Sequence, residues 1–240
     1  MSSALARRIE LLNKRFENAA PLEILRGSIG EEFPGKVALV SSFGTESAAL
    51  LHLIAQIDRN TPVVFLDTGK LFGETKKYRD QLIDLFGLTA VTSVQPDTAA
   101  LAARDARGIL WTQNPDACCA LRKVEPLNRA LAPYDAWFTG RKAFQAATRA
   151  ALPLFEIENN RIKINPIVRW TKADIDAYFT DHDLPHHPLE ADGYLSIGCM
   201  PCTSRVEPGE DARAGRWRGS DKVECGIHLP MGQAPARAEP

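Results

Sequence analysis

Two short apolar runs, each followed by a helical pattern, constrain the fold of this chain most strongly. They are "KVALV" (residues 36–40) and "TPVVFLDTG" (residues 61–69). Between them, residues 45–57 carry leucines and isoleucines at helical spacing. An amphipathic helix "ETKKYRDQLIDLFG" (residues 74–87) and a third strand "LTAVTSV" (residues 88–94) follow. This alternation predicts an α/β fold with a twisted parallel sheet and helices on both faces.

The remaining segments extend the same pattern. Residues 1–33 are predicted to be helical, and residues 98–132 also, except for a break at "GILWTQNPD". A fourth strand is predicted in "YDAWFTGRKAFQ" (residues 134–145) and a fifth in "RIKINPIVRW" (residues 161–170). A helix then begins at Thr171, a plausible N-cap with Asp174 three residues later.

Composition separates a folded part from a tail. Residues 1–205 are predicted to form one α/β nucleotide-binding domain that includes a metal site. Residues 206–240 are rich in Arg, Gly and Pro and hold few apolar residues, so a flexible tail is expected there.

Charge and hydropathy exclude several classes of function. The 240 residues carry 29 basic and 30 acidic side chains, a balance that argues against a surface that coats nucleic acid or binds a membrane. No apolar stretch reaches about 18 residues, and the first twenty residues lack the apolar core of a signal peptide. A cytoplasmic location is expected, where cysteines are more often metal ligands or reactive thiols than disulfides.

The loop "SSFGTES" (residues 41–47), directly after the first strand, is the first candidate site. Its pattern is close to S-G-G-x-D-S, the phosphate loop of ATP pyrophosphatases, but Phe43 replaces the first glycine. Ser41, Ser42, Gly44 and Thr45 remain for polar contact with an anion. We expect the phenyl ring to reduce the room for a triphosphate, which disfavours ATP cleavage.

Four cysteines form a candidate metal site. Cys118 and Cys119 are adjacent, and Cys199 and Cys202 form a C-x-x-C motif about 80 residues later. Four thiolates suit a zinc ion or an iron–sulfur cluster. The adjacent pair favours the cluster, because neighbouring residues do not easily place both sulfur atoms on one tetrahedral ion. A redox role for the C-x-x-C pair is the other possibility.

The fifth cysteine, Cys225, stands apart in "ECGIHLP" on the predicted tail. It is either an incidental surface thiol or a nucleophile carried by a hinged segment. A thiolate needs positive surroundings, and several basic residues lie just upstream. His228 is a possible partner of the thiolate or a docking contact. The upstream basic residues are Arg213, Arg216, Arg218 and Lys222.

These motifs together resemble the assimilatory adenylylsulfate reductases, the thioredoxin-dependent, iron–sulfur relatives of phosphoadenylylsulfate reductase. The resemblance covers roughly residues 36–229. It includes Phe43 in the loop, "LDTG", "ET" at Glu74-Thr75, "GRK" and the terminal "ECGIH". It also includes the adjacent cysteines followed by Lys123, and the C-x-x-C motif.

The resemblance implies a fold like that of the adenine nucleotide alpha hydrolases (PP-loop proteins) and a reaction. Cys225 would attack the sulfur of adenosine 5′-phosphosulfate, releasing AMP and leaving an S-sulfocysteine. Reduced thioredoxin, or glutaredoxin, would then free sulfite, a step of assimilatory sulfate reduction. The four other cysteines would hold a [4Fe–4S] cluster.

The resemblance also implies substrate contacts. Lys123 would lie between the cluster and the substrate, and Arg213 and Arg216 would hold the phosphosulfate. Arg141 is a further candidate, and Leu66 and Gly140 would contact the adenine through backbone groups.

Some features depart from the cluster-bearing members and leave alternatives open. Ser42-Phe43-Gly44 is closer to the branch that uses the 3′-phosphorylated nucleotide, and Phe72-Gly73 replaces a frequent "HP". Reduction of 3′-phosphoadenylylsulfate, or of both nucleotides, is therefore an alternative. More remote alternatives are a tRNA-thiolating PP-loop enzyme and a binding module with structural zinc. Neither a nucleic acid nor a membrane is an expected partner, and a homo-oligomer is possible.

Overall fold

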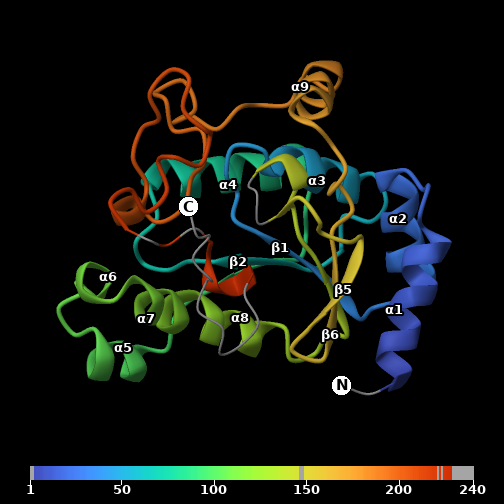
Figure 1. Ribbon diagram of the computed structural model, residues 1–240, viewed down its shortest axis with the longest axis horizontal. Helices are drawn as coiled ribbons and strands as arrows, with labels where there is room; N and C mark the ends of the chain where they lie inside the picture. The colour runs from blue at the N-terminus through green and yellow to red at the C-terminus, as the bar shows by residue number, and fades with distance from the viewer. Residues whose placement is uncertain (1–2, 146–148, 221, 223, 229–240) are drawn as a thin grey trace.

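The fold is a six-stranded sheet covered by helices on both faces (Figure 1). The computed structural model describes residues 3–145, 149–220, 222 and 224–228. The strand order is β3-β2-β1-β4-β6-β5, and all neighbouring pairs are parallel except β5 and β6. The strands are β1 (Val37–Ser41), β2 (Val63–Leu66), β3 (Val91–Val94), β4 (Ala136–Phe138), β5 (Phe155–Glu158) and β6 (Arg161–Ile164).

The helices occupy the connections between strands. They are α1 (Ser3–Arg15), α2 (Pro21–Gly27), η1 (Ser28–Glu32), α3 (Ser47–Ala55), α4 (Gly73–Phe86), α5 (Thr98–Arg104), α6 (Leu110–Gln113), α7 (Pro115–Cys119), η2 (Ala120–Val124), α8 (Glu125–Ala130), η3 (Ala143–Gln145), α9 (Lys172–Asp181), η5 (Met200–Cys202) and η6 (Gly226–His228). The predicted capping box is present: Asp174 N donates to Thr171 Oγ1, and Thr171 N donates to the Asp174 carboxylate.

Alternation along β1 assigns its residues to two cores. Val37 and Leu39 belong to a large cluster that includes residues of α2 and α3, whereas Ala38 joins a smaller cluster with Leu127 of α8 and Trp137 of β4. Figure 1 shows α3 and α4 on one side of the sheet and α5 to α8 on the other. The predicted α/β class is therefore confirmed.

Two local predictions need correction. The strand predicted over residues 161–170 is β6 and ends at Ile164, and it pairs with β5, a strand that was not predicted. Asn159 and Asn160, with φ values of 51° and 60°, form the tight turn between the two strands. The predicted break at residues 108–116 contains the four-residue helix α6, which is capped at its end by Asn114.

The described residues of the C-terminal segment (206–220, 222 and 224–228) fold back over the carboxyl edge of the sheet. Thr203 and Arg216 form an antiparallel bridge, and Trp217 N donates to Cys202 O at 3.1 Å. Glu224 and Cys225 are only 5% and 7% exposed. Cys225 was expected to be exposed, and this expectation is wrong. Ion pairs, backbone hydrogen bonds and the buried Trp217 hold its segment against the domain, although the segment has few apolar residues. Among the described residues, no helix is long and apolar enough to span a membrane.

Candidate functional site

A cavity of about 470 Å³ lies where β1, β2 and β4 end. Parallel α/β sheets place their ligand sites at this edge. Residues of the β1 loop, of η2 and of the C-terminal segment line it. It brings together all the substrate residues named from the sequence, and also Cys225 and His228: Ser41, Ser42, Gly44, Thr45, Leu66, Lys123, Gly140, Arg141, Arg213 and Arg216. Their contacts with a substrate stay a prediction.

The loop after β1 corrects the expectation about Phe43. Its ring is fully buried and packs edge-on against Phe65 at 5.3 Å between centroids, inside the large core. Only its backbone, in the left-handed region at φ 49°, forms part of the loop. The ring therefore takes no room from a triphosphate. The N–H groups of Phe43 and Gly44 instead donate to the side chains of Ser41 and Ser47, at 3.2 and 2.9 Å.

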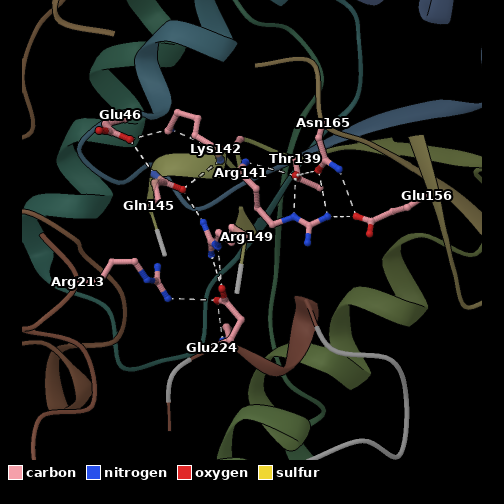
Figure 2. A network of polar contacts seen from close by, with 12 residues as sticks. Glu46, Thr139, Arg141, Lys142, Gln145, Arg149, Glu156, Asn165, Arg213 and Glu224 are labelled. Atoms are coloured by element: carbon pink, nitrogen blue, oxygen red, sulfur yellow. Dashed lines mark hydrogen bonds and ion pairs between the residues drawn. The ribbon is translucent and has the colours of Figure 1, made fainter. Parts of the chain in front are cut away.

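Most cations around the cavity already have carboxylate partners, as Figure 2 shows. Arg141 pairs with Glu156 and also contacts Thr139 and Asn165. Lys142 Nζ lies 2.7 Å from the carboxylate of Glu46, which lies in the β1 loop just before α3. These buried charges are compensated within the protein, as buried ions generally must be.

Two further pairs converge on Glu224. Arg149 reaches one carboxylate oxygen with Nε at 2.8 Å and Nη2 at 2.7 Å, and Arg213 Nη2 lies 3.2 Å from the other. Cys225 N donates to that second oxygen at 2.9 Å.

Lys123 and Arg216 differ from these cations. Within the described ranges neither has an ion pair, and Arg216 Nε is buried without a hydrogen-bond partner. The Arg216 guanidinium lies 4.4 Å from the centre of the Trp217 ring. Burial opposes the charge on Lys123, but the negative charges of the thiolate forms of Cys199, Cys225 and Cys119 outweigh it and hold the pKa of Lys123 above its ordinary value. Both side chains are available to an anion in the cavity.

The environment of Cys225 favours a thiolate. While Cys119 is protonated, a hydrogen bond from its thiol is the main cause that holds the pKa of Cys225 well below its ordinary value, against the effect of burial. A Cys119 sulfur bound to a metal would have no proton to donate. Lys123 and Arg216 add to this stabilisation. His228 contributes differently: its backbone N–H donates to Cys225 O at 2.9 Å, and burial keeps the pKa of its ring well below the ordinary value. This hydrogen bond lies within the turn η6, and His228 Nδ1 is buried without a hydrogen-bond partner among the described residues, so both alternatives for His228 stay predictions.

The other four cysteines line a second, smaller cavity together with Arg122, Lys123 and Trp217. Cys118 and Cys119 end α7, Cys199 directly precedes the turn η5, and Cys202 is its last residue. All four are free thiols. Within the part of the chain that the structure describes, no three His, Cys, Asp or Glu side chains are arranged to hold a single metal ion.

Arg149 and Glu224 were not singled out from the sequence. Glu224 belongs to the "ECGIH" motif, so its position beside the nucleophile was a usable signal. Arg149 lies in "QAATRA", which carries no recognisable pattern, and its role depends on a partner 75 residues away.

Comparison with known proteins places these features in a family. The profile of the phosphoadenosine phosphosulfate reductase domain matches residues 36–205. The chain is 57% identical over 218 residues to the adenosine 5′-phosphosulfate reductase of Mesorhizobium japonicum, covering 91% of this chain and 86% of that protein. It is 40% identical to the phosphoadenosine 5′-phosphosulfate reductase of Gloeobacter violaceus, covering 92% and 93%.

Similarity to solved structures supports the same family. The crystal structure of the phosphoadenylyl-sulfate reductase of Candida auris, a phosphate complex, superimposes with a TM-score of 0.70 at 30% identity, covering 86% of this chain and 98% of that chain. The FMN adenylyltransferase of Candida glabrata, at 15% identity and a TM-score of 0.53, shares the fold alone, covering 85% and 75%. The fold expected from the PP-loop resemblance is confirmed. The chain belongs to the phosphoadenosine phosphosulfate reductase family.

Proposed function

We propose that this protein reduces adenosine 5′-phosphosulfate to sulfite and AMP in assimilatory sulfate reduction, with a reduced dithiol protein such as thioredoxin or glutaredoxin as the electron donor. The observation that carries the proposal is the position of Cys225 in a nucleotide-sized cavity beside Lys123 and Arg216, two cations without carboxylate partners among the described residues. The relative with 57% identity is named for this substrate.

In the first step, the Cys225 thiolate attacks the sulfur atom of the sulfate group. A bond forms between the two sulfur atoms, and the bond from the sulfate sulfur to the bridging oxygen breaks. AMP leaves with that electron pair, and Cys225 carries an S-sulfonate. The thiolate and the sulfate are both anionic, so at about 4 Å they repel each other by roughly 4 kcal/mol at an effective dielectric constant near 20. Lys123 and Arg216 offset this repulsion.

In the second step, a thiolate of the reductant attacks Cys225 Sγ. The bond between the two sulfur atoms breaks, and sulfite leaves with its electron pair. The resulting mixed disulfide is resolved by the second thiol of the reductant, which restores Cys225 and leaves the reductant oxidised. Two electrons thus pass from the dithiol to the sulfate sulfur.

The proposal includes a [4Fe–4S] cluster held by Cys118, Cys119, Cys199 and Cys202. Support comes from the shared small cavity that these four free thiols line, with Arg122 and Lys123 beside it. A cluster with four thiolate ligands is net negative, so adjacent cations suit it. When bound it would stabilise this end of the sheet and shape the local field. A brown protein with a broad visible absorbance shoulder is the expected result, and a colourless purified protein would contradict it.

Three further expectations go with this function, on the division of the chain, its location in the cell and the contacts of the adenine. The segment of residues 206–240 would carry the nucleophile as a unit separate from the domain of residues 1–205. Free cysteines and a dithiol reductant suit the cytoplasm. The adenine would bind near the strand-end backbone of Leu66 and Gly140, which line the cavity.

The proposal is tested by incubating the enzyme with adenosine 5′-phosphosulfate and reduced thioredoxin and measuring sulfite. The 3′-phosphorylated nucleotide is assayed in parallel, because a relative at 40% identity is named for that substrate. We expect sulfite from the unphosphorylated nucleotide. Comparable rates with both would establish dual specificity, and release only from the 3′-phosphorylated one would replace our assignment. No sulfite from either would refute it.

The nucleophile has its own test. Cys225→Ser should abolish sulfite release, because a serine hydroxyl cannot form the sulfur–sulfur bond, while AMP binding and cluster colour persist. Mass spectrometry of wild-type enzyme incubated with the nucleotide alone should show one SO₃ group on the Cys225 peptide. Wild-type turnover by the serine variant would remove Cys225 from the mechanism.

A further inference from the structure

Asn165 is a buried side chain that connects several parts of the strand-end region. It directly follows β6 and is 0% exposed. Its Oδ1 accepts hydrogen bonds from Thr139 Oγ1 at 2.6 Å and from Arg141 Nη2 at 3.1 Å. Its Nδ2 donates to Pro153 O at 2.9 Å and to the Glu156 carboxylate at 3.2 Å. Figure 2 shows this group of side chains at the right of the polar network.

The amide of Asn165 has no freedom to change these contacts. A carboxamide can accept two hydrogen bonds on its oxygen and donate two from its nitrogen, and all four are formed. Arg141 can only donate and the Pro153 carbonyl can only accept, so the oxygen and the nitrogen of the amide cannot exchange places. An aspartate would turn a carboxylate toward two acceptors, and a leucine would leave buried polar groups unpaired. The position therefore suits asparagine and neither of these residues.

The position of the end of β4 depends on Asn165. β4 ends at Phe138, and Thr139 N still donates to the last residue of β6 at 2.9 Å. Gly140 lies one residue further along the chain. The hydrogen bond from Thr139 to Asn165 fixes it from one side, and Lys142 Nζ, which donates to Gly140 O at 3.1 Å, fixes it from the other.

Gly140 belongs to the apolar part of the nucleotide cavity. A Cβ on Gly140 would lie 3.9 Å from Leu50 Cδ2, and apolar side chains from the strand ends line the cavity around it. The cations without carboxylate partners among the described residues, Lys123 and Arg216, lie instead near Cys225. An apolar lining suits a planar base, and the cations suit the sulfate group. The apolar lining consists of Leu39, Leu50, Phe65, Leu66 and Trp137.

We propose that Asn165 is a positioning residue for base recognition, which through Thr139 holds the backbone of Gly140 where the edge of the adenine is read. The inference rests on the proposed function, because it requires that an adenine nucleotide occupies the cavity. Asn165 is not one of the described residues that line the cavity. Its effect on a bound base therefore passes through the residues that it holds.

A fixed backbone gives the site a way to distinguish bases. Adenine presents an acceptor at N1 and a donor at its amino group, whereas hypoxanthine presents a donor at N1 and an acceptor at O6. Backbone groups that match adenine thus meet the wrong partners on hypoxanthine, and such a mismatch is costly in a buried site. If the end of β4 can move, the backbone no longer favours one pattern, and the distinction is lost.

The first test measures base discrimination by the full-length protein as purified, without turnover. Isothermal titration calorimetry should show that AMP binds at least about tenfold more tightly than inosine 5′-monophosphate. Asn165→Ala should weaken AMP binding at least about tenfold and inosine 5′-monophosphate binding less than about threefold. Asn13→Ala is the matched control, because Asn13 makes two hydrogen bonds with the backbone of Phe155 in the same hairpin and does not line the cavity. It should leave the ratio of the two affinities within about threefold of the wild type.

A second set of variants decides the matter where Asn165→Ala does not fold, since that variant leaves buried polar groups unpaired. Thr139→Val keeps the shape of threonine and removes the hydroxyl that donates to Asn165, so it should show the same loss for AMP. Thr139→Ser keeps the hydroxyl and should restore AMP binding to within about threefold of the wild type. Thr139→Val/Asn165→Ala should cost no more than the worse single variant, because both break the same contact.

The kinetics separate base positioning from the chemical step. With adenosine 5′-phosphosulfate, Thr139→Val should raise KM at least about tenfold and leave the rate of S-sulfonation at saturating nucleotide within about threefold. The reason is that none of the four side-chain contacts of Asn165 involves Cys225 or the cations beside it.

Three results would overturn the inference. The first is a wild type that binds AMP and inosine 5′-monophosphate alike, or binds neither. The second is a wild-type ratio of the two affinities in Thr139→Val or in folded Asn165→Ala, and the third is full additivity of these two variants in AMP binding. Failure of the proposed function is distinguishable: a protein that releases no sulfite can still prefer AMP and lose this preference in Thr139→Val.

Discussion

At the scale of single residues, the site is defined by which charges lack a partner. Arg141, Lys142 and Arg149 each have a carboxylate, whereas Lys123 has none within the described part of the chain. Lys123 also lines both cavities, that of the nucleotide and that of the four cysteines. An unpaired cation in such a place is best explained by an anion that binds there.

We therefore expect Lys123→Ala to lower kcat/KM for adenosine 5′-phosphosulfate by more than about tenfold, equivalent to ~1.4 kcal/mol of transition-state stabilisation. Without the positive charge of Lys123, the repulsion between the Cys225 thiolate and the sulfate group is no longer offset. Steady-state sulfite release measures it, and Lys77→Ala, on an exposed face of α4, serves as the control. Kinetics equal to the wild type would show that Lys123 does not meet the substrate.

The residue scale also shows what the sequence can predict. Spacing grouped four cysteines as a candidate metal site and left Cys225 apart, and the structure brings the four to one cavity and Cys225 to the other. Their roles came from the family resemblance and stay predictions. Phe43 was misjudged because its backbone and its ring have separate roles, and only tertiary packing against Phe65 decides where the ring lies. Arg149 was missed because nothing local marks the partner of a buried ion.

At the scale of elements, the C-terminal segment and the C-x-x-C turn support each other. Ser204 N donates to Gly215 O at 2.8 Å, next to the bridge of Thr203 with Arg216. Gly215 is needed here, since a Cβ on it would lie 2.1 Å from the carbonyl oxygen of Ser204. The turn after Cys202 thus sets the position of Arg216 in the cavity.

Gly215→Ala should push the segment of Gly215 and Arg216 away from the segment of Thr203 and Ser204, and so displace Arg216. We expect either the affinity for AMP or the rate of S-sulfonation of Cys225 to fall at least about tenfold. A tenfold change corresponds to ~1.4 kcal/mol in the free energy of binding or of activation. A change in fluorescence from the buried Trp217 should accompany it. Gly73→Ala is the control, because a Cβ there meets open space. Unchanged binding, rate and fluorescence would show that the bridge is dispensable.

Elements with regular periodicity were predicted well, and irregular contacts were not. The first three strands and the flanking helices follow from their apolar patterns. The segment after residue 205 has too few apolar residues to predict docking, and it docks through Trp217, backbone hydrogen bonds and ion pairs. Such contacts join residues far apart in sequence, so composition does not indicate them.

At the scale of the whole molecule, the strand order places chemistry from distant segments at one edge. β1 lies between β2 and β4, so their following loops share the cavity. The sequence predicted a parallel sheet but not this order, because local patterns do not specify which strands are neighbours. A second long-range link, Thr75 of α4 with His187, ties the helix to the segment that leads to the C-x-x-C turn.

This link makes the stability of the fold depend on pH. His187 is 1% exposed, and its Nδ1 accepts a hydrogen bond from Leu189 N, so the proton of the neutral ring is on Nε2 and is donated to Thr75 Oγ1 at 3.0 Å. Burial lowers the pKa of His187 to about 4, although Glu74 opposes the shift. The unfolded chain, with a pKa near 6.5, binds the proton first as the pH falls.

The stability contributed by neutral His187 is therefore complete above about pH 6.5 and is lost progressively between about 6.5 and 4. From pH 7.5 to pH 5 the loss is about 2 kcal/mol. Urea unfolding at both pH values should show that the free energy of unfolding of His187→Gln falls less than that of the wild type, by about this amount. His186→Gln, which removes a neighbouring exposed ring, should follow the wild type. An equal pH dependence in His187→Gln would mean that the folded chain takes up this proton as readily as the unfolded one, and the acid sensitivity would then have to come from the carboxylates of the buried ion pairs.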